Sequence, residues 1–361
     1  MTHRPLLRQT AYPDAVPETI PDLADLRALN PAQQPNYPDA AAVDAVRTEL
    51  RKRPPLVFAG ECDDLKARLA QVAAGNAFLL QGGDCAETFS SVTAADIRDK
   101  LRVQLSMAVV LQYAAQLPVV KVGRIAGQYA KPRSNDIEAR GEVSLPSYRG
   151  DAVNGFDFTS EARIPDPRRL IDVYNASAST LNLVRAFVTG GFADLRAVHS
   201  WNADFVRNSG VEGRYEALAA EIERALGFMI ACGINDDELT TINFYASHEA
   251  LLLDYEHPLT RIDSRTDEPY NVSGHMLWIG ERTRQLDGAH VEFLRHVRNP
   301  LGVKIGPTTT AEDAVALAER LDPNHEPGRL TFISRMGAGR VREALPPIVT
   351  AVEATGRRVA W

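Results

Sequence analysis

The chain has 361 residues, of which 45% are hydrophobic and 24% charged, and its formal net charge at pH 7 is −7. This composition is typical of a soluble protein with a large core, and the acidic balance argues against a general nucleic-acid surface. The N-terminus lacks an apolar signal core and no run reaches transmembrane length, so we expect a cytoplasmic protein that binds neither nucleic acid nor a membrane. Any anion that it binds must be held by a local cluster of Arg and Lys.

Residues 1–55 are rich in Pro and are predicted to form an arm on the main body, residues 56–361. The Pro residues of "NPAQQPNYPD" (30–39) and "RPP" (53–55) break the arm into short pieces, because Pro lacks an N–H and ends helices. One helix is expected at 40–53, packed on the main body or on another subunit.

From residue 56 onward, short apolar runs with polar ends alternate with longer helical patterns. Continuous apolar runs are typical of strands covered on both faces of a parallel sheet. The succession therefore predicts an α/β fold of the (β/α)8 TIM-barrel type, with a doubly wound open sheet as the alternative. The runs occupy 77–85, 118–127, 241–249, 275–282, 301–307 and 330–337, a seventh begins at 357–361, and helices are expected at 94–117, 311–321 and 341–356.

Residues 141–240 interrupt this alternation between the second and the third run. Within them, the stretches 167–187 and 214–233 carry helical patterns. We expect this range to be an insertion of extra helices that serves assembly or regulation.

Charged side chains end several of the predicted strands. In parallel α/β folds, functional groups lie at the carboxyl ends of the strands, so these charges should converge. One strand-end Arg usually makes a surface salt bridge, but four cations on a net-acidic chain predict a pocket for a small polyanion. The cations are Arg124, Arg282, Lys304 and Arg335, and the same ends carry Asp84, Cys85, His248, Glu249 and Glu281.

The loop "AKPRSND" (130–136) follows the second strand and contains Lys131, Arg133 and Ser134. Taken alone, it would be a solvated turn set by its Pro. Beside Arg124 we interpret it as a second anion site, for another phosphate.

Cys85 follows "GGD" at the end of the first strand. A Cys with apolar neighbours is most often a small buried residue, whereas a thiolate at a strand end would be a nucleophile or a metal ligand. Cys62 and Cys232 have no such setting and are expected to be structural. His248 and His275 show no metal-binding spacing and are expected to pack or to orient other groups.

Seven motifs in chain order make the sequence similar to one known family. They are "LLQGGDCAETF", "VVKVGRIAGQYAKPRS", "LPSYRGD", "YASHEALLLDYE", "WIGERTRQLDGAH", "GVKIGPTTT" and "ISRMG". From about residue 30 to its last residue the chain resembles the class II (plant and actinomycete type) 3-deoxy-D-arabino-heptulosonate 7-phosphate (DAHP) synthases. The resemblance implies a (β/α)8 barrel, a divalent metal such as Mn²⁺ or Co²⁺, and a homo-oligomer. It also implies the condensation of phosphoenolpyruvate with erythrose 4-phosphate, the first step of the shikimate pathway to aromatic amino acids.

Site residues follow from the resemblance, motif by motif. The residues that would bind phosphoenolpyruvate are Arg124, Glu281, Arg282, Lys304 and Arg335, and Lys131 would contact its carboxylate. Arg133 and Ser134 would face erythrose 4-phosphate. Cys85 would be a metal ligand. Arg124, Lys304 and Glu281 would be the catalytic groups, and Glu281 would orient a water or relay a proton.

The resemblance implies three further metal ligands, a His, a Glu and an Asp, after the strand that begins "RRVAW" (357–361). They would follow Trp361, so we expect a barrel truncated within its seventh strand, with Cys85 as the one ligand of the set. The chain would then be a fragment of a longer enzyme, or a natural short form that binds phosphoenolpyruvate or a partner without turnover. Another sugar-phosphate aldolase barrel would explain the cations but not the motifs.

Overall fold

The computed structural model describes residues 20–190 and 242–361, with 192, 198, 201, 220–225, 227, 228 and 231 between them. Three helices precede the first strand: α1 (Leu23–Ala28), α2 (Ala40–Lys52) and α3 (Ala59–Ala73). The helix expected at 40–53 is confirmed by α2, which begins where the Asp39 carboxylate accepts the Ala42 N–H at 3.1 Å.

The arm is held on the main body by the buried carboxylate of Asp254. Arg47 Nε donates to it at 2.8 Å and Arg27 Nη2 at 3.1 Å. Asp254 lies in the short helix α9 (Leu253–Glu256), directly after a strand of the main sheet. Of the two packing partners expected for the arm, the main body is therefore one that it contacts.

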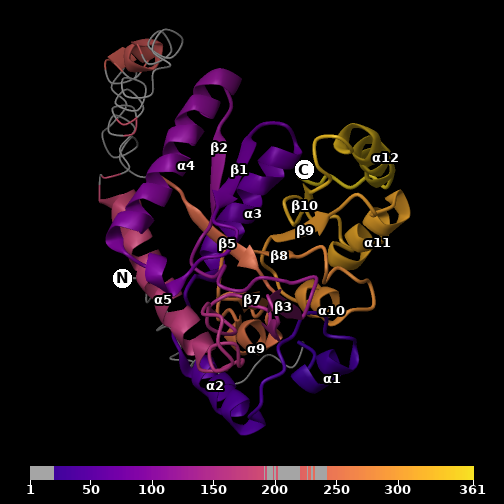
Figure 1. Cartoon of the computed structure of the whole chain (residues 1–361). Helices are drawn as coiled ribbons and strands as arrows, with labels where there is room; N and C mark the ends of the chain where they lie inside the picture. Colours follow the sequence, from indigo (N-terminus) through magenta and orange to yellow (C-terminus); the bar gives the residue numbers. More distant parts are fainter. Residues whose placement is uncertain are drawn as a thin grey trace, which may run out of the picture.

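Six parallel strands form the main sheet, and their order in space is their order along the chain (Figure 1). They are β1 (Phe78–Gly83), β2 (Val119–Arg124), β5 (Tyr245–Glu249), β8 (Met276–Ile279), β9 (Leu301–Ile305) and β10 (Leu330–Ser334). All six predicted strands are confirmed. A doubly wound sheet reverses its strand order in the middle, so that alternative is wrong and the sheet has the winding of a TIM-type barrel.

The seventh apolar run meets the last strand at one point. Ala360 forms an isolated parallel bridge with Thr331, and the Phe332 N–H donates to the Ala360 carbonyl at 2.8 Å. A parallel pairing therefore begins here, and the expected truncation within a seventh strand stays a prediction.

Long helices cover the outer face of the sheet. α4 (Ala94–Ala115) and α5 (Arg169–Thr189) lie on the side of β1 and β2, whereas α10 (Ala289–Arg295), α11 (Ala311–Leu321) and α12 (Val341–Ala354) cover β8 to β10 (Figure 1). The helices predicted at 94–117, 311–321 and 341–356 are confirmed. No described helix is long and apolar enough to cross a membrane.

The alternation of side chains along each strand separates two layers of core. On β8, Leu277 and Ile279 pack in the cluster formed with α10, α11 and α12, whereas Met276 packs on the other face with Leu65 and Leu69 of α3. Because Trp278 shares the side of Met276, it faces the inside of the curled sheet. The inner positions beyond it, at the carboxyl end, are where the predicted functional groups lie.

Short elements complete the described fold. Two antiparallel hairpins are formed by β3 (Ile137–Arg140) with β4 (Val143–Pro146) and by β6 (Thr260–Ile262) with β7 (Pro269–Asn271). The short helices η1 (Phe89–Ser91) and η2 (His257–Leu259) precede α4 and β6. Of the range 141–240, the described part includes α5, which confirms a helix within 167–187. The expected helix at 214–233 and Cys232 lie largely or wholly outside the described residues.

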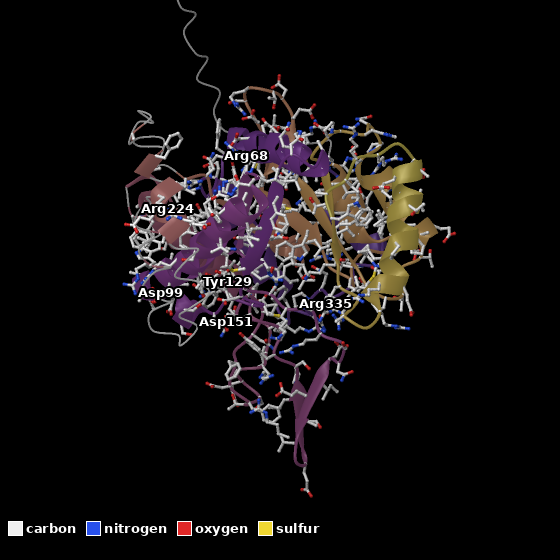
Figure 2. The ribbon with its side chains drawn as sticks, turned by 90° about the horizontal axis from the view of Figure 1, so that it is seen from above. Arg68, Asp99, Tyr129, Asp151, Arg224 and Arg335 are labelled. Atoms are coloured by element: carbon white, nitrogen blue, oxygen red, sulfur yellow. The ribbon has the colours of Figure 1, made fainter. Side chains whose placement is uncertain are left out.

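The two ends of the curled sheet are distinct in Figure 2. The β3–β4 hairpin projects from the body on the side where Arg335 is labelled, and Arg68 of α3 lies at the opposite side. The side of Arg335 carries the carboxyl ends of the strands.

Candidate active site at the carboxyl ends of the strands

Two of the predicted cations lie over the buried ring of Trp278. The Arg124 guanidinium carbon is 4.9 Å and Lys304 Nζ is 5.2 Å from the ring centroid, within reach of a cation–π attraction. The ring has room because Trp278 pairs with Gly302, where an added Cβ would lie 2.9 Å from the Cβ of Trp278. The strand-end positions predict both cations, whereas no sequence signal distinguishes this Trp from an ordinary core residue.

A buried carboxylate accompanies Lys304. Glu249 Oε2 lies 3.1 Å from Lys304 Nζ, and the two side chains are 2% and 17% exposed. The other oxygen, Oε1, is buried and has no hydrogen-bond partner among the described residues. Gly280 lies against it: an added Cβ would lie 2.0 Å from that oxygen, so a side chain at this position would require the Glu249 carboxylate to move. Glu249 is thus a site residue whose partner the sequence could not reveal, because its position at a strand end says nothing of which cation faces it.

Glu281 and Arg282, the next predicted pair, follow β8 and contact different groups. Glu281 Oε1 accepts from Arg284 Nη2 at 3.2 Å, while its Oε2 is buried and has no hydrogen-bond partner in the described part of the chain. Arg282 Nη2 donates to the Ser134 hydroxyl. The loop 130–136, in which a second anion site is predicted beside Arg124, is therefore brought to the end of β8.

The loop that carries Lys131 and Arg133 is fixed by backbone contacts. The Lys131 N–H donates to the Arg149 carbonyl at 2.8 Å, and Arg133 Nε donates to the Tyr148 carbonyl at 2.5 Å. Gln33 of the arm accepts the Arg133 N–H at 2.8 Å. The arm thus reaches the predicted phosphate site, which its Pro-rich sequence gave no reason to expect.

Most of the predicted cations lack counter-ions. Within the described residues, Arg124, Lys131, Arg133, Arg282 and Arg335 make no ion pair, whereas Lys304 pairs with Glu249. Buried polar atoms without protein partners also collect here: Arg124 Nε, Glu249 Oε1, Trp278 Nε1 and Glu281 Oε2. Since buried polar groups in folded proteins are normally hydrogen-bonded, this arrangement is suited to an anionic ligand with several oxygen atoms.

Cys85 is exposed, so the buried-filler interpretation of this residue is wrong. Its carbonyl accepts from Arg124 Nη2 at 3.2 Å, so this residue lies beside the cation cluster. Among the described residues no three His, Cys, Asp or Glu side chains are close enough to hold a metal ion together. A divalent ion needs more donors than one thiolate, so the described residues do not by themselves fit the implied metal.

The remaining described thiol and the two histidines have structural roles. Cys62 is buried, and burial raises the pKa of its thiol. His248 Nε2 lies 2.9 Å from Glu256 Oε1, and His275 Nδ1 accepts the Ala246 N–H at 2.9 Å. Both rings are buried, which confirms that they pack and orient other groups.

A hollow elsewhere on the molecule does not gather the predicted residues. A cavity of about 880 Å³ lies between residues 72–79, at the start of β1, and residues 353–361. Its lining includes Arg357 and Arg358 but none of the predicted site residues. The chemistry therefore points to the carboxyl ends of the strands.

Comparisons with known proteins give one consistent result. The family model described as Class-II DAHP synthetase family matches residues 22–361. The chain is 64% identical over 335 residues to the phospho-2-dehydro-3-deoxyheptonate aldolase of Streptomyces coelicolor, covering 93% of this chain and 74% of that protein. It is 55% identical over 335 residues to phospho-2-dehydro-3-deoxyheptonate aldolase AroG of Mycolicibacterium smegmatis, covering 91% and 71%.

Proposed function

The chain belongs to the Class-II DAHP synthetase family, and we propose that it condenses phosphoenolpyruvate with erythrose 4-phosphate at the carboxyl ends of its strands. The products are 3-deoxy-D-arabino-heptulosonate 7-phosphate and inorganic phosphate. The single observation that carries this assignment of the site is the group of Arg and Lys side chains that converge there, of which Lys304 alone has a carboxylate partner among the described residues. A substrate pair with two phosphates and a carboxylate matches that excess of positive charge.

The cations divide between the two substrates by position. Arg124 and Lys304, over one aromatic ring, bind phosphoenolpyruvate together with Arg282 and Arg335, and Lys131 neutralises its carboxylate. Arg133 and Ser134, in the loop fixed by the arm, face the phosphate of erythrose 4-phosphate.

In the reaction, carbon 3 of phosphoenolpyruvate forms a bond to the aldehyde carbon of erythrose 4-phosphate, whose oxygen takes up a proton. Carbon 2 becomes cationic and is attacked by water, which loses a proton. The bond between carbon 2 and the phosphate oxygen then breaks while the new hydroxyl at carbon 2 becomes the keto group, and its proton leaves with inorganic phosphate. The buried, unpartnered Oε2 of Glu281 is suited to orient that water or accept its proton, while Arg124 and Lys304 stabilise the charge on the departing phosphate.

The divalent metal of the family is assigned no step in this scheme. Cys85 is the proposed ligand, at the edge of the cation cluster, and the described residues supply no further two side chains to join it. For the fold, we propose that the curled sheet is part of a (β/α)8 barrel, which its singly wound parallel order supports.

The test is release of inorganic phosphate when the purified chain is given both substrates with Mn²⁺ or Co²⁺, against a control without erythrose 4-phosphate. Calorimetric titration with phosphoenolpyruvate alone should show binding. Binding without phosphate release would support the second candidate, a protein that binds phosphoenolpyruvate without turnover, which the incomplete set of metal donors favours. Absence of binding would contradict both.

A further inference from the structure

Glu87 lies two residues beyond Cys85, and its side chain is almost fully buried. Its carboxylate accepts three consecutive backbone N–H groups: Ala126 at 3.1 Å, Gly127 at 3.0 Å and Gln128 at 2.8 Å. The Glu87 N–H in turn donates to the Gln128 carbonyl at 2.7 Å. Successive backbone N–H groups directed at one point form a concave anion site, and here the anion is a side chain of the protein.

The segment that Glu87 holds, residues 125–130, joins two proposed ligands of phosphoenolpyruvate. Arg124 precedes it at the end of β2, and Lys131 follows it. At its far end, Gln128 Oε1 accepts the N–H of Glu249, the carboxylate partner of Lys304. The segment is therefore connected to three of the cationic positions of the site.

The backbone of this segment has a conformation that is unfavourable for its residues. Ala126 has φ 61°, a left-handed conformation that residues with a Cβ rarely adopt. Gly127 packs against the His248 ring so closely that an added Cβ would lie 2.4 Å from Nδ1. Such a conformation persists only when its surroundings fix it, and the Glu87 carboxylate supplies three of the fixing contacts.

We propose that Glu87 is a positioning residue that holds the 125–130 segment so that Arg124 and Lys131 present their charges to phosphoenolpyruvate at a fixed separation. The carbonyl of Cys85, two residues away, accepts from Arg124. The same short stretch of chain therefore fixes Arg124 from both sides. This role rests on the proposed function, because it names the substrate whose binding the segment serves.

Asp322 offers a matched control at the other end of the sheet. It is also a buried carboxylate that accepts a backbone N–H, that of Glu326 at 2.8 Å, in the loop that precedes β10. Both carboxylates accept backbone N–H groups, so replacing either with an amide should disturb the fold in the same way, but only Glu87 adjoins the site.

The test compares Glu87→Gln with Asp322→Asn in the full chain, using calorimetric titration of phosphoenolpyruvate and backbone amide hydrogen exchange. A neutral amide cannot accept three N–H groups, so Glu87→Gln should weaken phosphoenolpyruvate binding about tenfold and accelerate exchange at residues 126–128. Asp322→Asn should lower the melting temperature without changing either quantity. If Glu87→Gln fails to fold, Glu87→Asp, which keeps the charge but retracts it by one methylene, should give a smaller change in the same direction.

Unchanged binding and exchange in a Glu87 variant that melts earlier, as Asp322→Asn does, would make Glu87 a purely structural residue and overturn the proposal. Faster exchange with unchanged affinity would also overturn it, because the segment would be held for a reason other than the substrate. If the parent chain does not bind phosphoenolpyruvate, the proposed function fails first, and the exchange result then reports on the backbone contacts alone.

Discussion

The two ends of the curled sheet use their polar groups differently. At the amino ends, which we name the floor, the groups pair with one another: Tyr245 and Arg68 bind Asp64, and Arg185 and His275 bind Glu61. At the carboxyl ends, which we name the mouth, the predicted cations have no carboxylate partner within the residues that the structure describes, apart from the pair of Lys304 and Glu249.

This difference separates stability from binding. A charge that is paired inside the protein contributes to the folded state and has little left to offer a ligand. A charge held near other like charges without a partner costs stability, and such an arrangement is typical of a site for a ligand of opposite charge. Variants at the floor should therefore change stability alone, and variants at the mouth should change binding first.

The largest effect is expected for Lys304→Met, which removes a cation from the mouth and leaves the buried Glu249 carboxylate without a counter-ion. Breaking a buried pair on one side costs about 3 kcal/mol of unfolding free energy, measurable by urea denaturation, and phosphoenolpyruvate binding should be lost. In the double variant Lys304→Met with Glu249→Gln, the free energy of unfolding should recover, whereas phosphoenolpyruvate binding should stay lost. Recovery of both quantities would show that Lys304 acts only by neutralising Glu249.

Arg335→Ala should affect binding alone, because Arg335 is exposed and makes no ion pair with a described residue. Loss of one charge-assisted contact should weaken phosphoenolpyruvate binding roughly tenfold to a hundredfold, with unfolding free energy changed by less than about 0.5 kcal/mol. The matched control at the floor, Arg68→Ala, should leave calorimetric affinity unchanged. Equal affinities of the two variants for phosphoenolpyruvate would show that Arg335 is not part of the binding site.

Tyr245→Phe should affect stability alone. The Tyr245 hydroxyl donates to the Asp64 carboxylate at the floor, and loss of one such hydrogen bond costs about 1 kcal/mol. Urea denaturation should detect this change while titration with phosphoenolpyruvate gives the parent affinity. A weaker affinity would mean that floor and mouth are coupled through β5.

The smallest effect is expected for the pH dependence of the unfolding free energy that arises at the floor. Burial raises the pKa of Glu61, but the contacts with His275, the Phe58 N–H and Arg185 outweigh it and lower this pKa to about 2, from an ordinary 4.5. A lowered carboxyl pKa contributes stability above the unfolded value, which is lost as the pH falls from about 4.5 towards 2. Glu61→Gln should therefore reduce the slope of unfolding free energy against pH in this window, and an unchanged slope would count against the pairing.

Much of the fold could be predicted because its signals are local. Apolar runs with polar ends located all six strands, and helical periodicity located α4, α11 and α12. Both signals are local, because burial on both faces of a sheet, or on one face of a helix, requires apolar residues at particular positions of that segment. The strand-end positions of Arg124 and Lys304 likewise followed from the rule that functional groups lie at carboxyl ends.

The partners of those residues could not be predicted. That Arg124 and Lys304 share one aromatic ring, and that Glu249 faces Lys304, depends on the register of strands that are distant in sequence. The role of Glu87 leaves no signal in the sequence, because its hydrogen-bond donors are backbone N–H groups, which every residue except Pro carries.

The sequence by itself determined which segments form strands and helices, which family the chain resembles and which cations end the strands. Only the tertiary structure decided that Cys85 is exposed beside Arg124, that the arm reaches Arg133, and that one buried carboxylate holds the segment between Arg124 and Lys131. The physical reason is that residue types and periodicity are properties of a chain position. Contacts between positions exist only once the curled sheet brings the strand ends together.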